Sequence, residues 1–232
     1  MPIVPPSEEK EERVAALARG IVQAVPFAGG LLAESIDLWV NPVEKRKTRW
    51  VKEVSAAINQ LCEDLCVLPE TLANDERFVS FLMQATLIAL RNHQEEKISA
   101  LKAALTASTG TSCFSEDEGF VFLRYVDELT PTHLRILAHL STQKEHLELA
   151  AKLDDIYTLV ATDVANLDRT LFRICLRDLA SRSLVVFDDI DDFPEYDTKR
   201  EFVVTEASGK RPLTVTEAGT RFLAFIALGP NS

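Results

Sequence analysis

Apolar residues recur at helical spacing along most of this chain, and no other feature of the sequence constrains its fold more. Near the start, the apolar positions fall three and four residues apart. They are Val14, Leu17, Ala18, Ile21, Val22 and Val25. This spacing places one apolar stripe along a helix, and the stripe must be buried against other helices. Only 8 of the 232 residues are glycine, so few positions interrupt such helices.

Proline, glycine and capping residues divide the first half of the chain into several helices. The run Pro26–Gly30 ends the first helix, whereas Asn41 and Pro42 are typical of a helix start. The predicted helices are residues 7–25, 31–40, 41–66 and 75–93, the last continued by 94–107, with a break at 67–74. Several helices with apolar faces form a bundle, which we predict over residues 1–112.

After a small polar connector at residues 109–114, the second half of the chain is predicted to contain short strands as well as helices. Ser115 and Glu118 form a capping-box pattern, and Thr130 with Pro131 starts another helix. Helices are expected over 115–126, 130–141, 147–164, 168–183 and 216–228, and short strands over 184–187, 202–205 and 213–215. Three helices, a small β-wing and a closing helix are typical of a winged helix-turn-helix. The predicted fold class is therefore mostly α, with a helical bundle followed by a winged-helix-like α+β module at residues 113–232.

Charge and cysteine usage limit the class of protein. The net charge of −11 disfavours a general affinity for nucleic acid, because phosphate contacts need clustered Lys and Arg. The longest uncharged run, Gly20–Ala33, is shorter than the roughly 18–20 residues that cross a bilayer. The first residues do not resemble a secretion signal, and no two cysteines form a CxxC pair. We therefore expect a cytoplasmic protein with reduced thiols, with peripheral membrane contact as an alternative.

Four stretches carry a resemblance to known bacterial proteins. They are the Pro/Gly-broken segment 25–34 with the basic residues after it, and segments 84–97, 129–137 and 213–219, the last reading LTVTEAG. Together they resemble uncharacterised bacterial proteins that join a helical front half to a winged-helix-like tail. The chain is more loosely similar to the abortive-infection alpha (Abi-alpha) family. The resemblance covers most of the chain through motifs of low specificity, and it implies a bacterial setting and phage defence without any catalytic residue.

One candidate contact surface lies on the predicted helix that begins at Asp168. Arg169, Arg173 and Arg177 are four residues apart and share a face of that helix, so they suit contact with DNA or with a partner. The predicted wing that follows is acidic, with Asp188, Asp189, Asp191, Asp192, Glu195 and Asp197. Since these carboxylates repel phosphate, a protein partner is favoured over nucleic acid, and a solvated helix face is the simplest alternative.

A second candidate surface is a basic cluster that directly follows the broken hairpin. It comprises Lys45, Arg46, Lys47, Arg49 and Lys52. Basic residues near an anionic membrane contribute about 1 kcal/mol each, so Lys45, Arg46, Arg49 and Lys52 are candidates for contact with a membrane or a partner. Glu44 and Glu53 lie among them, and an ordinary solvated helix face is favoured.

No motif in the sequence indicates catalysis. Cys62 and Cys66 are spaced to meet on one helix face, but without further ligands nearby we expect them to be buried as small apolar residues. His133, His139 and His146 lack the HExxH arrangement, and His93 is interpreted as a surface residue. The acidic run 188–192 lacks the pattern of a calcium loop. We predict no cofactor, no metal and no enzymatic activity.

These observations favour a non-enzymatic bacterial interaction or regulatory protein. The helical bundle and the winged-helix-like module would both serve protein contacts, with another protein or with a second copy of the chain. One alternative is a winged-helix transcription regulator that binds DNA through Arg169, Arg173 and Arg177. The other is an abortive-infection effector that associates with membranes through residues 13–52.

Overall fold

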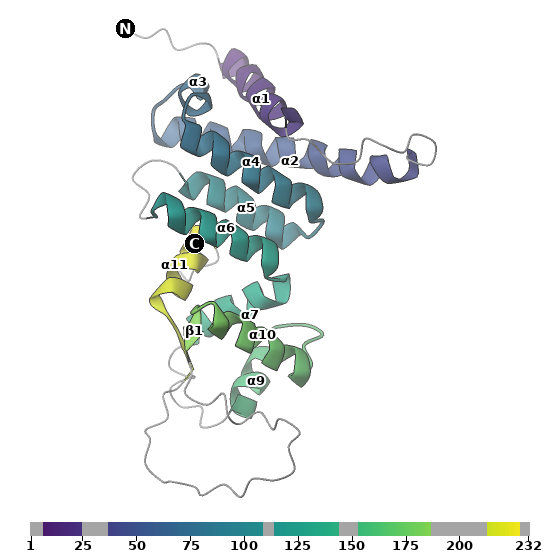
Figure 1. Ribbon diagram of the computed structural model, residues 1–232, viewed down its shortest axis with the longest axis vertical. Helices are drawn as coiled ribbons and strands as arrows, with labels where there is room; N and C mark the ends of the chain where they lie inside the picture. Colours follow the sequence, from purple (N-terminus) through teal and green to yellow (C-terminus); the bar gives the residue numbers. More distant parts are fainter. Residues whose placement is uncertain (1–6, 25–36, 109–113, 144–152, 187–212, 228–232) are drawn as a thin grey trace, which may run out of the picture. The chain divides into compact units, whose positions relative to one another are not determined.

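The computed structural model describes residues 7–24, 37–108, 114–143, 153–186 and 213–227. These residues are mostly helical, as the sequence predicts, with ten helices and one two-stranded sheet among them (Figure 1). The chain divides into two compact units. The first comprises residues 1–129 and 225–227, and the second comprises residues 130–224 and 228–232.

The first unit is a helical bundle. Its helices are α1 (Ser7–Ala24), α2 (Asp37–Asp64), α3 (Pro69–Ala73), α4 (Glu76–Arg91), α5 (Glu95–Ala107) and α6 (Glu116–Glu128). The longest helix, α2, packs against α1, α4 and α5, while α6 packs against α4 and α5 (Figure 1). Val14, Ala18 and Val22 of α1 are fully buried, which confirms the apolar stripe predicted for the first helix.

A buried polar pair lies inside this bundle. The indole Nε1 of Trp50 donates a hydrogen bond to Thr86 Oγ1 at 3.0 Å, and that hydroxyl donates to the Leu82 carbonyl at 2.7 Å. Trp50 and Thr86 are both 1% exposed or less. The bond therefore satisfies a donor that has no access to water, and it joins α2 to α4.

The predicted start of the second long helix is wrong. Asn41 and Pro42 lie inside α2, which begins at Asp37. Proline lacks an N–H and normally interrupts a helix, but near the N-terminus it removes only one early intrahelical bond. The helix therefore continues through Pro42. The helix predicted over residues 31–40 lies largely outside the described residues.

Two further boundaries differ from the prediction. The expected break at residues 67–74 contains the short helix α3, which starts at Pro69, a favourable first-turn residue. Residues 94–107 do not continue α4, because Asn92 adopts an extended conformation (φ −105°, ψ 142°) and a new helix begins at Glu95. The turn brings α5 back beside α4, and their contact buries Leu101 and Leu105 of α5 among others.

The division between the two units lies after Leu129, whereas the sequence predicted it at residue 112. The helix between these positions, α6, begins at the predicted cap, since Ser115 Oγ accepts the Glu118 N–H at 3.2 Å. Its apolar residues Phe122, Leu123 and Val126 are buried. Because α6 packs against α4 and α5, it belongs to the bundle.

The second unit contains helices and the small sheet. Its elements are α7 (Pro131–Thr142), α9 (Leu153–Ala161), α10 (Arg169–Ser181), β1 (Val185–Val186), β2 (Thr214–Val215) and α11 (Glu217–Phe225), whose last residue belongs to the first unit. The strands pair antiparallel, Val185 opposite Val215. α7 packs against α10, α9 and β2. The predicted caps are present, because Thr130 opens α7 and Asp168 Oδ1 accepts the Leu171 N–H at 2.8 Å.

The motif LTVTEAG forms β2 and the start of α11. Thr216 Oγ1 accepts the Gly219 N–H at 2.9 Å and donates to the Ser183 carbonyl at 2.6 Å. A Cβ atom on Gly219 would lie only 2.2 Å from the Leu184 carbonyl oxygen. The glycine is therefore required by the close approach of α11 to the end of α10 and β1.

Two other predictions concern the wing and the membrane. The strand predicted over residues 202–205 and the acidic wing lie outside the described residues, and the strand predicted over 213–215 is confirmed as β2. Among the described residues, no helix combines the length and apolar character that a bilayer span requires.

Candidate functional site

A hollow on the first unit gathers three of the four basic residues predicted as a contact surface. Lys45, Arg46 and Arg49 line it from α2. The other lining residues are Trp50 of α2, Asn92 and His93 of the α4–α5 connection, and Ile98 of α5. We call this site the α2 hollow. Its volume is about 160 Å³ and no lining residue is acidic, so its electrostatic field favours an anion.

The two arginines of the α2 hollow are oriented by neighbours on the opposite wall. Arg46 Nη1 donates to the Leu90 carbonyl at 3.1 Å, close to the end of α4. Arg49 forms an ion pair with Glu95, the first residue of α5. The Glu95 side chain is 76% exposed, and such solvent-accessible pairs contribute little stability. The guanidinium of Arg49 can therefore exchange this partner for another anion.

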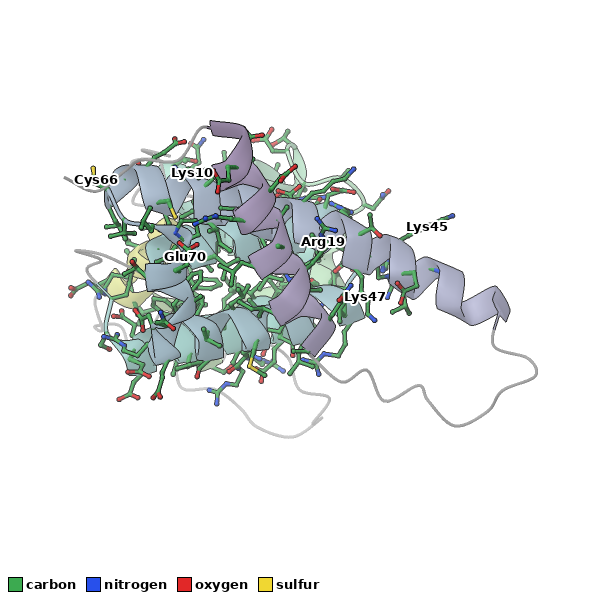
Figure 2. All side chains as sticks on the ribbon, turned by 90° about the horizontal axis from the view of Figure 1, so that it is seen from above. Lys10, Arg19, Lys45, Lys47, Cys66 and Glu70 are labelled. Carbon is green, nitrogen blue, oxygen red and sulfur yellow. The ribbon has the colours of Figure 1, made fainter. Side chains whose placement is uncertain are left out.

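The remaining basic residues lie in different surroundings. Lys45 is exposed at the rim of the α2 hollow, and Figure 2 shows its side chain extending away from the bundle. Lys47 pairs with Glu44 at 3.2 Å. Lys52 is exposed but does not line the hollow. The predicted cluster is therefore divided, and only its N-terminal part forms a concave site.

Two polar residues of the α2 hollow come from elsewhere in the sequence. Asn92 Nδ2 donates to the Ile88 carbonyl at 2.9 Å, which holds the side chain against the end of α4. His93 follows it and is exposed. The sequence predicts His93 as a surface residue, which is confirmed, but no sequence pattern connects it with the basic cluster. Only the turn between α4 and α5, which packs beside α2, brings these residues together.

A second concave surface lies between α4 and α6, and it is not among the surfaces that the sequence predicts. Its lining residues are Ser80, Met83, Gln84, Leu87, Ile88, Arg91, Arg124 and Asp127. We call it the α4/α6 groove; its volume is about 440 Å³. Met83 is 39% exposed and Leu87 is 44% exposed. Their four-residue spacing on α4 was a usable signal, because it places two large apolar side chains on one helix face.

Charged residues close one end of the α4/α6 groove. Arg91 Nη2 pairs with Asp127 Oδ2 at 2.7 Å. The Asp127 backbone carbonyl accepts a hydrogen bond from Lys97 Nζ at 2.7 Å, and Lys97 is only 4% exposed. Burial lowers the pKa of Lys97; the Asp127 carboxylate opposes this shift and Arg91 adds to it. These contacts fix the relative positions of α4, α5 and α6 at this end of the groove.

The predicted arginine face of α10 is on the surface. Arg169 and Arg177 are exposed and Arg173 is half-buried. The Arg169 guanidinium lies over the Tyr157 ring, 5.1 Å from its centroid. Ile174, on the same helix, is 58% exposed. The face therefore combines cationic and apolar groups, as surfaces that bind proteins or nucleic acids do.

No protein-family model, curated protein or solved structure matches this chain. The resemblance to the abortive-infection alpha proteins stays a prediction from its sequence motifs.

The predicted burial of Cys62 and Cys66 is confirmed for Cys62 and wrong for Cys66. Cys62 is buried and burial raises its thiol pKa, but Cys66 is exposed, because α2 ends at Asp64 and the chain turns at Cys66 with φ 53°. The two thiols therefore do not share a helix face. Cys175 is buried, and burial raises its pKa to about 11. Within the described residues no group of His, Cys, Asp and Glu is arranged to hold a metal ion.

The histidines of α7 have structural partners. The Nδ1 atom of His133 accepts the Thr130 N–H at 3.2 Å, which completes the capping box of the helix. His133 Nε2 lies 3.3 Å from Asp178. His139 Nδ1 lies 3.1 Å from Asp163. These contacts connect α7 with α10 and with the segment after α9. His146 lies outside the described residues.

Proposed function

We propose that this chain is a non-enzymatic, cytoplasmic interaction protein of bacteria, and that its bundle binds a helix of a partner protein in the α4/α6 groove. The observation that carries the proposal is the exposure of Met83 and Leu87 inside a concave surface. Exposed large apolar side chains gathered in a groove are typical of protein interfaces. Methionine suits such grooves, since its flexible side chain adapts to different partners.

The shape and charge of the groove favour an amphipathic helix as the ligand. The groove runs along α4, where Ser80, Met83, Leu87 and Arg91 follow at helical spacing. A partner helix would place its apolar stripe over Met83 and Leu87. Two arginines, Arg91 and Arg124, and one acidic residue line the groove, so its net charge complements a partner helix with acidic flanking residues.

Site-specific photo-crosslinking tests this proposal in cells. A photoreactive amino acid replaces Leu87, and in the matched control it replaces Leu68, which is similarly exposed (46%) but does not line the groove. We expect a defined cross-linked protein from position 87 and none from position 68. Met83→Asp should abolish the product. Equal products from both positions would contradict the groove, and turnover of a nucleotide or nucleic acid by the pure protein would contradict a non-enzymatic role.

One observation favours DNA binding by the second unit as an alternative. Its order of α7, α9 and α10, then β1 and β2, then α11 supports a winged-helix-like module, in which α10 would be the recognition helix. Arg169, Arg173 and Arg177 follow one face of α10. The acidic residues between β1 and β2 in the sequence still favour a protein as the ligand of this module.

Fluorescence anisotropy with duplex DNA at low salt distinguishes these ligands. If α10 reads DNA, Arg173→Ala should weaken binding about tenfold or more, as expected for the loss of one charged contact. Arg135→Ala is the control, because Arg135 is exposed on α7, outside the predicted recognition helix. No binding by the unmodified protein would exclude the alternative.

A further inference from the structure

The α2 hollow has the properties of a small anion site, and this inference is independent of the groove proposed above to bind a helix. Arg46 and Arg49 line it, Lys45 lies at its rim, and no carboxylate is among the lining residues. We propose that the α2 hollow binds a phosphomonoester group. Near neutral pH such a group carries about −1.5 to −2 charges and three acceptor oxygens, which match several N–H donors at one place.

The donors are already held in position. One N–H group of the Arg46 guanidinium donates a hydrogen bond to the Leu90 carbonyl at 3.1 Å. A guanidinium has five N–H donors in a fixed fork. The bond to Leu90 therefore orients the whole guanidinium, and its other N–H donors can bind a ligand. Arg46 is half-buried in the hollow wall. A pre-oriented donor loses little conformational entropy when the ligand binds.

Glu95 pairs with Arg49 at the edge of the α2 hollow, although Glu95 does not line it. The Glu95 carboxylate contacts Arg49 from the first turn of α5, although most of its surface is in solvent. A phosphate group has more charge than a carboxylate and would replace Glu95 at the Arg49 guanidinium. Glu95 therefore competes with the ligand, and its removal should increase the affinity.

The size of the α2 hollow suits a single phosphate group better than a larger ligand. At about 160 Å³ it is smaller than the roughly 300–1,000 Å³ of pockets that enclose drug-sized ligands. A single phosphate group fits, whereas a whole nucleotide would extend out of the site. The lining side chains Trp50 and Ile98 are buried and apolar, so they add a low-dielectric wall that strengthens the ionic contacts.

Titration with soluble phosphates tests the site. The probes are inorganic phosphate and glycerol phosphate, added to the full chain and followed through the Asn92 and His93 amide signals in NMR spectra. We expect saturable shifts. Arg49→Ala should weaken binding about tenfold or more. Lys52→Ala removes an exposed charge of the same helix outside the hollow and should change the affinity less than about twofold.

Glu95→Gln is the decisive variant, because misfolding cannot produce a gain. It should bind the same probes several-fold more tightly, as the competing carboxylate is removed. Unchanged or weaker binding by this variant would overturn the proposal. Equal weakening by Arg49→Ala and Lys52→Ala would also overturn it, since it would show a diffuse charge effect.

Sedimentation with vesicles separates the two sources of such a group. Phosphatidylcholine vesicles contain either phosphatidic acid, a phosphomonoester, or an equal fraction of phosphatidylglycerol, a phosphodiester. Sedimentation with phosphatidic acid vesicles, in addition to binding of the soluble phosphates, identifies a lipid headgroup as the source; binding of the soluble phosphates without sedimentation identifies a free phosphate compound. Equal sedimentation with both vesicle types, or no response to any probe, would overturn the proposal.

Discussion

At the scale of single residues, the buried bond between Trp50 and Thr86 yields the sharpest prediction. Thr86→Val keeps the shape of the side chain but leaves the Trp50 N–H without its acceptor. An unpaired buried donor costs about 1–3 kcal/mol, so we expect the free energy of unfolding to fall by that amount in urea titrations. In a Trp50→Phe background the same change should cost much less. Equal costs in both backgrounds would show that the hydrogen bond is unimportant.

Lys97 gives a prediction about pH at the same scale. Burial lowers its pKa in the folded chain below the ordinary value of 10.5. At a pH between the lowered pKa of the folded chain and 10.5, the Lys97 side chain is protonated in the unfolded chain but not in the folded chain. The contribution of Lys97 to stability therefore rises with pH in this range. We therefore expect the stability of the unmodified protein relative to Lys97→Met to increase across that window.

Urea titrations of both proteins from pH 7 to pH 10 measure this difference. The pKa of Cys175 is raised from 9.0 to about 11, so this thiol makes stability fall as the pH rises from 9 to 11. The effect is the same in both proteins and cancels in the difference. If the difference in the free energy of unfolding between the two proteins does not change with pH, Lys97 does not cause the pH dependence.

At the scale of secondary-structure elements, Gly219 determines how closely α11 approaches its neighbours. Gly219→Ala places a Cβ atom 2.2 Å from the Leu184 carbonyl oxygen and 2.8 Å from Val215 Cγ1. Since backbone atoms must move, we expect a loss of about 1–3 kcal/mol. Gly20→Ala is the matched control, because nothing lies within 4 Å of its added Cβ in α1, and it should gain about 0.5–1 kcal/mol.

Calorimetric melting temperatures compare the two glycine variants. The expected result is a lower melting temperature for Gly219→Ala and an unchanged or higher one for Gly20→Ala. A shift in the same downward direction for both would show that steric crowding at Gly219 is not the cause.

At the scale of the whole molecule, the first unit is assembled from two distant parts of the chain. Phe225 belongs to that unit and is fully buried. Its ring centroid lies 5.4 Å from Phe114 and Phe122 and 6.1 Å from Phe81. Removing such an aromatic residue from a core costs about 3–5 kcal/mol. A fragment of residues 1–129, which lacks Phe225, should therefore unfold more easily than the first unit of the full chain.

Hydrogen exchange measures this prediction on the amides of α4 and α6. We expect lower protection in the fragment and a comparable loss in full-length Phe225→Ala. Phe120→Ala is the control and should reduce the protection less, because Phe120 is only half-buried. Full protection in the fragment would show that the bundle needs no residue from the C-terminal end of the chain.

The sequence by itself determined most of the helices. Their apolar spacing and their caps at Ser115, Thr130 and Asp168 act within a few residues, so local patterns were sufficient to predict them. Local patterns also misplaced some boundaries. Pro42 predicts a helix start, yet it lies inside α2, since the gain from continuing the helix exceeds the loss of one bond.

The tertiary structure alone decided where the candidate sites lie. The sequence predicts Arg46 and Arg49 as part of a basic surface, but Asn92 and His93 join them only because α5 turns back beside α2. The α4/α6 groove likewise exists only where two helices pack and leave Met83 and Leu87 uncovered. Such concave surfaces depend on contacts between residues far apart in the chain, whereas helical periodicity and capping depend on near neighbours.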